Sequence, residues 1–156
     1  MKTELPEIQL QPLTLSEEDI AKYLAIEKSI EAPFVEITTD ADEARTELRD
    51  TEAQFILYKN KIVGCIAYQK REGEKGPYGY LWEIAISPEF QGHRIGEAAL
   101  QRVLKVYEAL PFVSLQVDPE NARALALYER LGFVIQKRIE NATENGRPRL
   151  LLMRFN

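Results

Sequence analysis

The chain has 156 residues, of which 45% are hydrophobic and 29% are charged, values typical of a folded domain and not of a disordered chain. A net charge of -5 and a pI near 5.1 argue against a surface that binds nucleic acid or an anionic membrane, because both partners need clustered basic charge. An acidic balance is compatible with a cationic substrate such as an amine. We therefore expect one domain over residues 1–156, with neither a nucleic-acid nor a membrane partner.

Three absences in the sequence narrow the function further. No stretch approaches the roughly 20 apolar residues that span a bilayer, and the first residues lack the apolar core of a signal peptide, so we expect a cytoplasmic protein. The single cysteine, Cys65, excludes an internal disulfide and a multi-cysteine metal site, and its apolar neighbours indicate a core position. The single histidine, His93, argues against a Ser-His-Asp triad and a two-histidine metal site. The sequence thus predicts no metal, and we expect His93 in a turn that faces solvent or phosphate.

The first third of the chain predicts one strand followed by two helices. Ile8 to Leu13 alternates as a strand does. Ser16 to Asp19 has the form of a capping box and begins a helix that ends near Ile30, and a second helix begins at Thr39 to Asp42. The acidic residues of this region are Glu17, Glu18, Asp19, Glu27, Glu31, Asp40, Asp42, Glu43, Glu47, Asp50 and Glu52. Such a set is typical of partners for helix dipoles and of a solvated helix face.

The middle of the chain predicts a hairpin, a loop and a strand. Gln54 to Tyr58 and Ile62 to Gln69 are apolar runs joined by a short polar turn, a pattern typical of an antiparallel hairpin. Arg71 to Gly79, with three glycines and mixed charges, predicts an exposed loop. Tyr80 to Ser87 is rich in aromatic and branched residues at the length of one strand, and a proline follows it.

A glycine-containing turn follows that strand, at Gln91 to Gly96. Apolar residues at helical spacing then predict a helix from Ile95 to Leu110. The first N–H groups of a helix lack carbonyl partners and carry partial positive charge, and glycine lets an anion approach them, so a phosphate cradle is expected here. The spacing matches neither a dinucleotide fingerprint nor a Walker loop, because Glu97-Ala98 stands where the latter needs Lys-Ser or Lys-Thr.

The last third of the chain predicts a strand, a helix and two more strands. Phe112 to Val117 alternates as a strand. Asp118 to Asn121 has the marks of a helix entry, with Asp as N-cap and Pro at the first helical position, and the helix ends before Gly132. Phe133 to Ile139 and Arg149 to Phe155 are expected strands. The predicted order is β-α-α-β-β-β-α-β-α-β-β, an α/β (α+β) domain with one mixed sheet flanked by helices.

The residues from Ser87 to Gly96 resemble motif A of the GNAT superfamily of N-acetyltransferases, whose Gln/Arg-x-x-Gly-x-Gly/Ala turn binds the pyrophosphate of acetyl-coenzyme A. Gln91, Ile95 and Gly96 are in register with that motif. Arg94 stands where the motif has its middle glycine. That exchange either reduces backbone freedom or adds a guanidinium near the phosphates.

A second stretch, Leu115 to Phe133, resembles motif B of the same superfamily, a strand followed by N-x-x-A-x-x-L-Y-x-x-x-G-F. The matching residues are Asn121, Ala124, Leu127, Tyr128, Gly132 and Phe133. The resemblance is close from Leu81 to Phe133 and loose over the rest of the chain. It implies the GNAT fold, a mixed, mostly antiparallel twisted sheet flanked by helices.

The resemblance implies transfer of an acetyl group from acetyl-coenzyme A to a primary amine by direct attack, with no acyl-enzyme. The family's tyrosine at the position of Tyr128 serves as general acid toward the thiolate. Some members carry a basic glutamate where this chain has Gln116, which does not usefully accept a proton. Other members place the base on the strand before the glycine turn, where this chain has Tyr80 and Glu83. Glu83 is costly in an apolar strand unless it is solvated at an edge, paired or functional, and water can carry the proton to either residue.

The resemblance also implies the contacts with acetyl-coenzyme A. They are Ile84, Ala85 and Ile86 for the pantetheine arm and the acetyl carbonyl, Gln91, Gly92, His93, Arg94, Ile95 and Gly96 for the pyrophosphate, and Asn121 and Tyr128 as further contacts. In the GNAT fold the segment between the first two helices helps to form the acceptor site, a second interpretation of their acids. The acceptor stays open between small amines (a polyamine, amino acid or aminoglycoside) and a protein N-terminus or lysine. A non-catalytic acyl-coenzyme A sensor and a homodimer also stay open.

Overall fold

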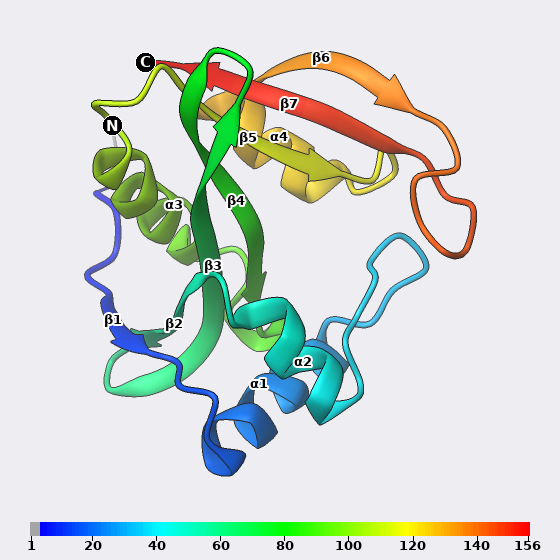
Figure 1. Cartoon of the computed structure of the whole chain (residues 1–156). Coiled ribbons are helices and arrows are strands. Elements are labelled where there is room, and N and C mark those ends of the chain that lie inside the picture. The colour runs from blue at the N-terminus through cyan, green and yellow to red at the C-terminus, as the bar shows by residue number, and fades with distance from the viewer. Residues whose placement is uncertain (1–3) are drawn as a thin grey trace.

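A seven-stranded mixed sheet in the order β1-β2-β3-β4-β5-β7-β6 forms the centre of the protein (Figure 1). The computed structural model describes residues 4–156, so the first three residues of the predicted domain lie outside the described part. The strands are β1 (Gln9–Pro12), β2 (Glu52–Tyr58), β3 (Lys61–Gly73), β4 (Gly76–Ile86), β5 (Phe112–Val117), β6 (Val134–Ile139) and β7 (Arg149–Phe155). Neighbouring strands are antiparallel except β4 and β5, which are parallel, and this confirms the predicted mixed sheet and element order.

Helices cover both faces of the sheet. They are α1 (Glu17–Ser29), α2 (Ala41–Leu48), α3 (Ile95–Val106) and α4 (Ala122–Arg130), with a 3-10 turn η1 (Pro88–Phe90) before α3. The two faces follow from the alternation of side chains along a strand. Ile66 of β3 packs in the cluster with α3 and α4, whereas its neighbours Cys65 and Ala67 pack with α1 and α2. Cys65 is therefore buried, as the sequence predicts.

Short-range signals set most of the helix ends. The side chain of Ser16 accepts a hydrogen bond from Asp19 N at the start of α1, and that of Asp40 accepts one from Glu43 N at the start of α2. Helix α3 ends at Val106, one turn before the predicted Leu110, and the side-chain amide of Asn156 donates to the carbonyls of Tyr107 and Leu110 in the turn that follows.

The predicted entry of α4 is wrong. Asn121, and not Asp118, is the N-cap of α4, and its side-chain oxygen accepts a hydrogen bond of 3.3 Å from Ala124 N. Asp118 is 2% exposed and binds arginines of the β6–β7 region instead. A charge partner far away in the sequence has thus overridden a local capping signal.

The predicted loop from Arg71 to Gly79 is also wrong, because β3 and β4 continue as a long hairpin through these residues. Their pairing runs to Gly73 opposite Gly76 at the turn. Aromatic contacts stabilise this extension: the ring of Tyr78 stacks on Phe112 with centroids 4.9 Å apart, and the Arg71 guanidinium lies 3.5 Å from the centroid of the Tyr80 ring. The glycine-rich composition predicts a loop, but contacts across the strands stabilise the ends of β3 and β4 here.

The sheet opens between β4 and β5. Within residues 4–156, these strands pair only through Gly79 and Tyr80 of β4. Beyond that point β4 follows β3 to Ile86 and β5 follows β7 to Val117, so the two strands diverge (Figure 1). An extra residue in β4, Trp82, bends the strand where the divergence begins, since Tyr68 pairs with Leu81 but the preceding residue of β3 pairs with Glu83. One edge of β4 is therefore left without a neighbouring strand over its last residues, up to Ile86.

This bent part of β4 lies unusually close to β3. A Cβ atom built on Gly64 of β3 would be 2.1 Å from the carbonyl oxygen of Ala85. We expect Gly64→Ala to lower the free energy of unfolding by about 2 to 3 kcal/mol through overpacking against rigid backbone. Urea denaturation measures it. Gly96→Ala is the matched control, because its Cβ would have neighbours at 3.7 Å, an ordinary contact, and an equal loss in both variants would contradict the explanation.

Candidate active site

The divergence of β4 and β5 opens into a cleft of about 1000 Å³. Four parts of the chain line it: the segment between α1 and α2, the end of β4, the turn before α3, and α4. Most of the predicted site residues line this cleft, namely Ile84, Ala85, Ile86, Gln91, Gly92, Arg94, Ile95, Gly96, Asn121 and Tyr128. Tyr80, Glu83 and His93 are not among the lining residues. Sequence reasoning did not single out other lining residues, among them Phe34, Val35 and Arg123.

The turn before α3 presents backbone N–H groups to the cleft. Arg94 is the N-cap of α3 and has a φ of 62°, and Gly92 has a φ of 88°, so both lie in the left-handed region. The first intrahelical hydrogen bond runs from Ala98 N to Arg94 O, and Arg94 gives α3 no side-chain cap. The amides of the first turn of α3 are therefore oriented as anion-binding groups.

Position 94 has a backbone conformation that favours glycine, but this chain has an arginine there. A non-glycine residue at positive φ is strained, and the structure holds it in place through its guanidinium. Arg94 Nη2 lies 2.8 Å from Glu97 Oε2, and Arg130 Nη2 lies 2.9 Å from the other oxygen of Glu97. The hydrogen bond from Arg94, followed by that from Arg130, lowers the pKa of Glu97 despite its burial. Arg94 therefore reinforces the turn by linking it to α3 and, through Glu97, to α4.

Gln91, which lines the cleft, and His93, which does not, both make hydrogen bonds that hold the turn. The Gln91 side chain donates to Ile86 O at 3.0 Å and accepts from Arg123 Nη1 at 2.8 Å, which links β4 to α4. His93 is exposed, and its Nδ1 lies 3.1 Å from Phe90 O. The backbone of this turn, more than its side chains, is thus available to a ligand.

Tyr128 lies on α4 and lines the cleft. It is 7% exposed, and its ring packs edge-on against Phe133 with centroids 5.7 Å apart. Burial raises its pKa well above the usual value near 10, and the neighbouring Glu83 and Tyr80 raise the pKa further. The phenol therefore keeps its proton at neutral and moderately alkaline pH and can only donate it there.

Glu83 points from β4 toward α1, so it is not a solvent-facing residue at a strand edge. Its carboxyl group lies 3.2 Å from Tyr23 Oη and 3.6 Å from Cys65 Sγ. Burial and, next, the charge of Glu27 raise the pKa of Glu83 well above its usual range. The expectation that Glu27 belongs to a solvated helix face is wrong, since Glu27 is 1% exposed. Its spacing of four from Tyr23 places it on the apolar face of α1, a signal that the sequence contains.

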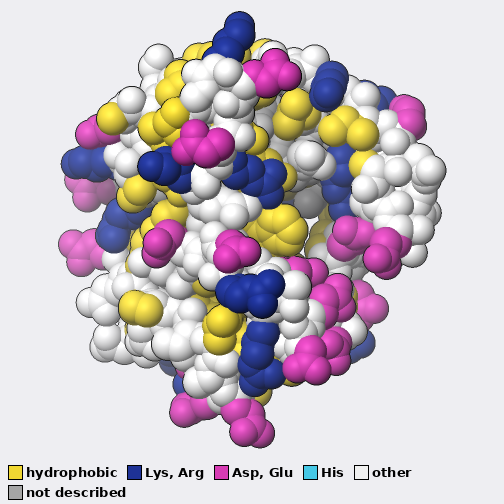
Figure 2. Space-filling view, viewed as in Figure 1, with side chains coloured by type: hydrophobic (Ala, Val, Ile, Leu, Met, Phe, Trp, Pro, Cys, Tyr) yellow, Lys and Arg dark blue, Asp and Glu magenta, His cyan; other side chains and the backbone are white. Residues whose placement is uncertain are grey.

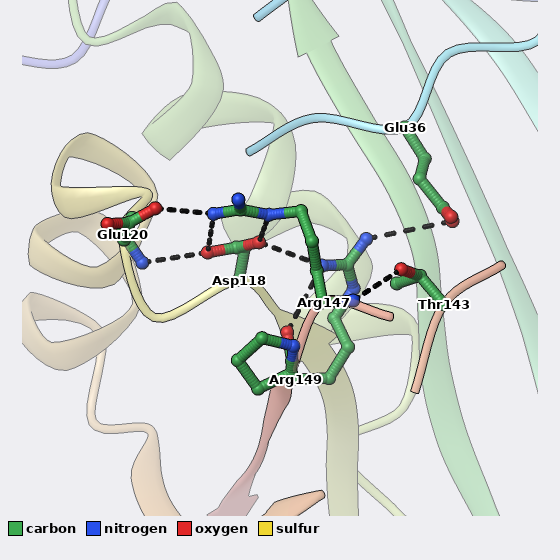
Figure 3. A network of polar contacts seen from close by, with 7 residues as sticks. Glu36, Asp118, Glu120, Thr143, Arg147 and Arg149 are labelled. Atoms are coloured by element: carbon green, nitrogen blue, oxygen red, sulfur yellow. Dashed lines mark hydrogen bonds and ion pairs between the residues drawn. The ribbon is translucent and has the colours of Figure 1, made fainter. Parts of the chain in front are cut away.

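A polar network surrounds Asp118, the residue that follows β5 (Figure 3). The carboxylate of Asp118 accepts hydrogen bonds from Arg147 Nε at 2.6 Å and from Arg149 Nη1 at 3.2 Å. Arg149 Nη2 also lies 3.7 Å from Glu36, in the segment between α1 and α2. The network therefore joins three segments that are far apart in the sequence, and no short-range pattern predicts it.

We expect Asp118→Asn to lower the free energy of unfolding by about 1 to 3 kcal/mol at pH 7, because it removes the buried charged acceptor that two partly buried arginines share. The hydrogen bond from Arg147 lowers the pKa of Asp118 below its ordinary value. The stabilisation is therefore complete above the unfolded pKa of about 3.9 and is lost as the pH falls through the lower folded pKa. Urea denaturation between about pH 2 and pH 7 should show a flatter acid limb for the variant.

Asp42→Asn is the matched control for that measurement. Asp42 lies 3.6 Å from Arg45 on the surface, and its side chain is 94% exposed. Exposed pairs contribute about 0 to 1 kcal/mol, so the change should be small. An equal loss in the two variants would show that the network does not stabilise the fold.

Within residues 4–156, no helix combines the length and apolarity needed to cross a membrane. The same residues contain no group of three or more His, Cys, Asp or Glu side chains placed to hold a metal ion.

Comparison with known proteins agrees with this geometry. The model of the acetyltransferase (GNAT) family matches residues 20–133. The chain is similar to a mycothiol acetyltransferase of Brachybacterium faecium, with 34% identity over 103 residues that cover 62% of this chain and 31% of that protein. It is also similar to the S-(2-succino)cysteine N-acetyltransferase of Bacillus subtilis, with 27% identity over 133 residues that cover 81% and 77% of the two chains. Several curated relatives are matched over half of their length or less.

Solved structures share the fold. A chain of the NatC complex bound to Gag peptide and CoA superposes with a TM-score of 0.73 at 24% identity, covering 96% of this chain and 99% of that one. The open seven-stranded sheet, the glycine turn and the matched family model over residues 20–133 lead to one conclusion. The chain belongs to the acetyltransferase (GNAT) family.

Proposed function

We propose that this chain transfers an acetyl group from acetyl-coenzyme A to a primary amine by direct attack of the amine on the thioester. One observation carries the proposal: the free edge of β4, the uncapped start of α3 and the protonated phenol of Tyr128 border the same cleft. A thioester carrier needs hydrogen bonds along its arm, a site for its diphosphate, and a proton donor at its sulfur. The named relatives are acetyltransferases, which favours an enzyme over a non-catalytic sensor.

The cleft suits the two ends of acetyl-coenzyme A. The first-turn amides of α3, at Ile95 to Glu97, have the position and polarity to bind the pyrophosphate, as proposed for the turn from Gln91 onward. The end of β4, at Ile84 to Ile86, offers backbone groups on the side away from β3, where β5 has diverged. The pantetheine arm would pair with that edge, and an N–H there would polarise the acetyl carbonyl. Asn121, at the start of α4, would be a further contact with the cofactor.

Tyr128 is the proposed general acid. Full proton transfer from a phenol of pKa about 10 to a thiolate whose acid has a pKa of about 8.5 is uphill by roughly 2 kcal/mol. Burial raises the pKa of Tyr128 further, so complete transfer is still less favourable. Tyr128 therefore acts by a hydrogen bond that strengthens as the thiolate forms, or by transfer concerted with C–S cleavage.

The proposed base is Glu83. An amine of pKa about 10 is roughly one part in a thousand neutral at pH 7, a deficit of about 4 kcal/mol, so its proton must be accepted during the reaction. Burial raises the pKa of Tyr80, so this phenol is protonated at pH 7 and is a poor acceptor. Glu83 is a carboxyl group whose pKa is raised toward that of an effective base. Because Glu83 does not line the cleft, we propose that a water molecule carries the proton to it.

The proposed acceptor site lies at the segment between α1 and α2. Glu31 lines the cleft there, next to the apolar Phe34 and Val35. Figure 2 shows a hollow near the middle of one face, with apolar side chains inside and acidic side chains gathered at its lower right. The carboxylate of Glu31, which pairs with Lys28 at 2.9 Å in the free protein, favours an ammonium group at this place. The Bacillus relative is named for a small cysteine derivative and the NatC structure holds a peptide, so small amines and peptide N-termini are both tested below.

The direct experiment combines calorimetry with acetyl-coenzyme A and release of free thiol against a panel of amines. The panel holds polyamines, amino acids, S-substituted cysteines, aminoglycosides, and peptides with free N-termini or lysines. We expect saturable binding and amine-dependent thiol release with one class. Tight binding without release for any amine would instead favour a sensor, and absence of binding would contradict the whole proposal.

The proposal also includes a cytoplasmic location, no nucleic-acid or membrane partner, and a homodimer as the oligomeric state to be tested. The net charge of -5 supports the absence of polyanionic partners. Cell fractionation tests the location, and size-exclusion chromatography with light scattering distinguishes a monomer from a dimer.

A further inference from the structure

A buried and a partly buried carboxyl group face one hydroxyl between α1 and β4. Glu27 of α1 is 1% exposed, and Glu83 of β4 is partly buried. Both side chains contact the hydroxyl of Tyr23 on α1. Ionised carboxylates can only accept hydrogen bonds.

The contacts of the Tyr23 hydroxyl indicate how many protons the two carboxyl groups hold. Tyr23 Oη lies 3.1 Å from Glu27 Oε1 and 3.2 Å from Glu83 Oε2. A phenol has one proton and can donate it to one of these oxygens. The other contact is favourable only when the carboxyl group donates to the phenol oxygen. Both contacts are satisfied when the Glu27–Glu83 pair contains one proton.

The donors around the pair indicate where this proton resides. Glu27 Oε1 accepts a hydrogen bond of 3.2 Å from the peptide N–H of Thr38 in addition to the contact with Tyr23. Glu83 has a weak thiol donor, Cys65 Sγ, at 3.6 Å. Glu27 Oε2 has no hydrogen-bond partner in the described part of the chain. Because Glu27 has the stronger donors, it is the more ionised partner, and a protonated Glu83 donates to the oxygen of Tyr23, whose own proton goes to Glu27.

The groups that face the pair are neutral or acidic. They are Tyr23 of α1, Cys65 of β3, Glu47 of α2, which shares Thr38 with Glu27, and Tyr128 of α4. Burial is the main reason why the pKa values of Glu27 and Glu83 are raised, and the charge of Glu27 is the next cause for Glu83. A second negative charge in this place is unfavourable, so the doubly ionised pair binds a proton more strongly than an isolated carboxylate does.

The pair lies beside the proposed reaction site. Ile84 and Ala85, the two residues after Glu83, line the cleft. The charge of Glu83 is near enough to Tyr128 to raise the pKa of that phenol. One water molecule between the cleft and Glu83 would complete a path for a proton.

We propose that Glu27 is a positioning residue for the reaction: it shares one proton with Glu83, and the pair that has lost this proton is the base for the amine. The inference rests on the proposed acetyl transfer. The N–H bond of the ammonium breaks and its proton passes through water to Glu83, which can then donate again to the oxygen of Tyr23. The freed nitrogen lone pair attacks the acetyl carbonyl, and the C–S bond breaks with its electron pair leaving on sulfur. The second proton of the attacking nitrogen is lost from the tetrahedral adduct and ends on the thiolate, which Tyr128 stabilises by a hydrogen bond, so the products are the amide and the free thiol. Glu27 acts through Glu83 and does not touch the substrate.

The test is Glu27→Gln. The amide keeps the shape of the side chain and can still accept from Thr38 and Tyr23, so the fold should persist. Loss of the like charge lowers the pKa of Glu83. We expect the midpoint of the Glu83 side-chain carboxyl, followed by ¹³C NMR without substrates and assigned with Glu83→Gln, to fall by about 1 unit or more. The acidic limb of kcat/KM against pH should move down by a similar amount, with a lower plateau.

Glu17→Gln is the matched control, since Glu17 lies on the same helix but is exposed. It should leave both midpoints unchanged. If Glu27→Gln does not move the NMR midpoint of Glu83, the two residues do not share a proton and the inference is wrong. If the NMR midpoint moves but the kinetic limb does not, the pair is not the base. If the wild type releases thiol with no amine, the proposed function fails, whereas the NMR titration still decides whether the proton is shared.

Discussion

Tyr128→Phe is expected to lower kcat by about 100-fold or more, while the Kd for acetyl-coenzyme A changes by less than about twofold. General acid catalysis typically contributes about 10² to 10⁴ in rate, and the variant removes only the proton donor. The ring that packs against Phe133 remains, so the cleft keeps its shape. Steady-state kinetics of thiol release and calorimetry with acetyl-coenzyme A measure the two quantities separately.

Tyr107→Phe is the matched control for that substitution. Tyr107 is also 7% exposed, and burial raises its pKa to about 12, but it packs against Tyr68 with ring centroids 5.9 Å apart and does not line the cleft. We expect it to leave kcat nearly unchanged. If Tyr128→Phe retains full turnover, or if both variants lose the same activity, Tyr128 is not the general acid.

Gly96→Val is expected to weaken binding of acetyl-coenzyme A by about 100-fold or more, which corresponds to roughly 2.7 kcal/mol. A Cβ on Gly96 would lie 3.7 Å from side-chain atoms of Ile84, Ile86 and Leu127, so it points into the space between β4 and α4. The proposed route of the cofactor passes through this space. Branching at Cβ would block the approach to the first-turn amides of α3. Calorimetry measures the loss.

Gly96→Ala separates this effect from damage to the fold. Its single methyl group makes ordinary contacts in the free protein, and alanine favours a helix over glycine by roughly 0.5 to 1 kcal/mol. We expect a variant that is at least as stable as the wild type, with binding weakened by about tenfold. Unchanged cofactor affinity in both variants, with native circular dichroism, would mean that the cofactor does not approach α3 at this turn.

Patterns within a few residues predicted most of the fold. The capping residues Ser16 and Asp40 behave as the sequence indicates. Lys59 and Asn60 form the predicted polar turn, with φ of 52° and 66°, and Gly132 takes the left-handed conformation after α4 with φ of 92°. These features depend on backbone conformation and nearest neighbours, which is why a single sequence contains the information.

Contacts between distant segments explain what the sequence could not predict. Asp118 resembles a helix cap, yet its partners Arg147 and Arg149 lie about thirty residues further along the chain. The sequence predicts Glu83 as a candidate base. It does not predict the neighbouring buried Glu27, because acids on a helix are usually exposed. The helical spacing of Glu27 with Tyr23 could have shown that it belongs to the buried face.

The central claim is that acetyl-coenzyme A binds where β4 leaves β5 and α3 begins, and amide chemical shifts recorded during an NMR titration of the wild type test it most directly. We expect the largest chemical-shift changes at the amides of Ile84 to Ile86 and of Gly92 to Glu97, and smaller changes at the start of α4. Shifts concentrated elsewhere, for example at the second cavity lined by Pro6 to Gln9 and Arg102, or no shifts at saturating cofactor, would contradict it.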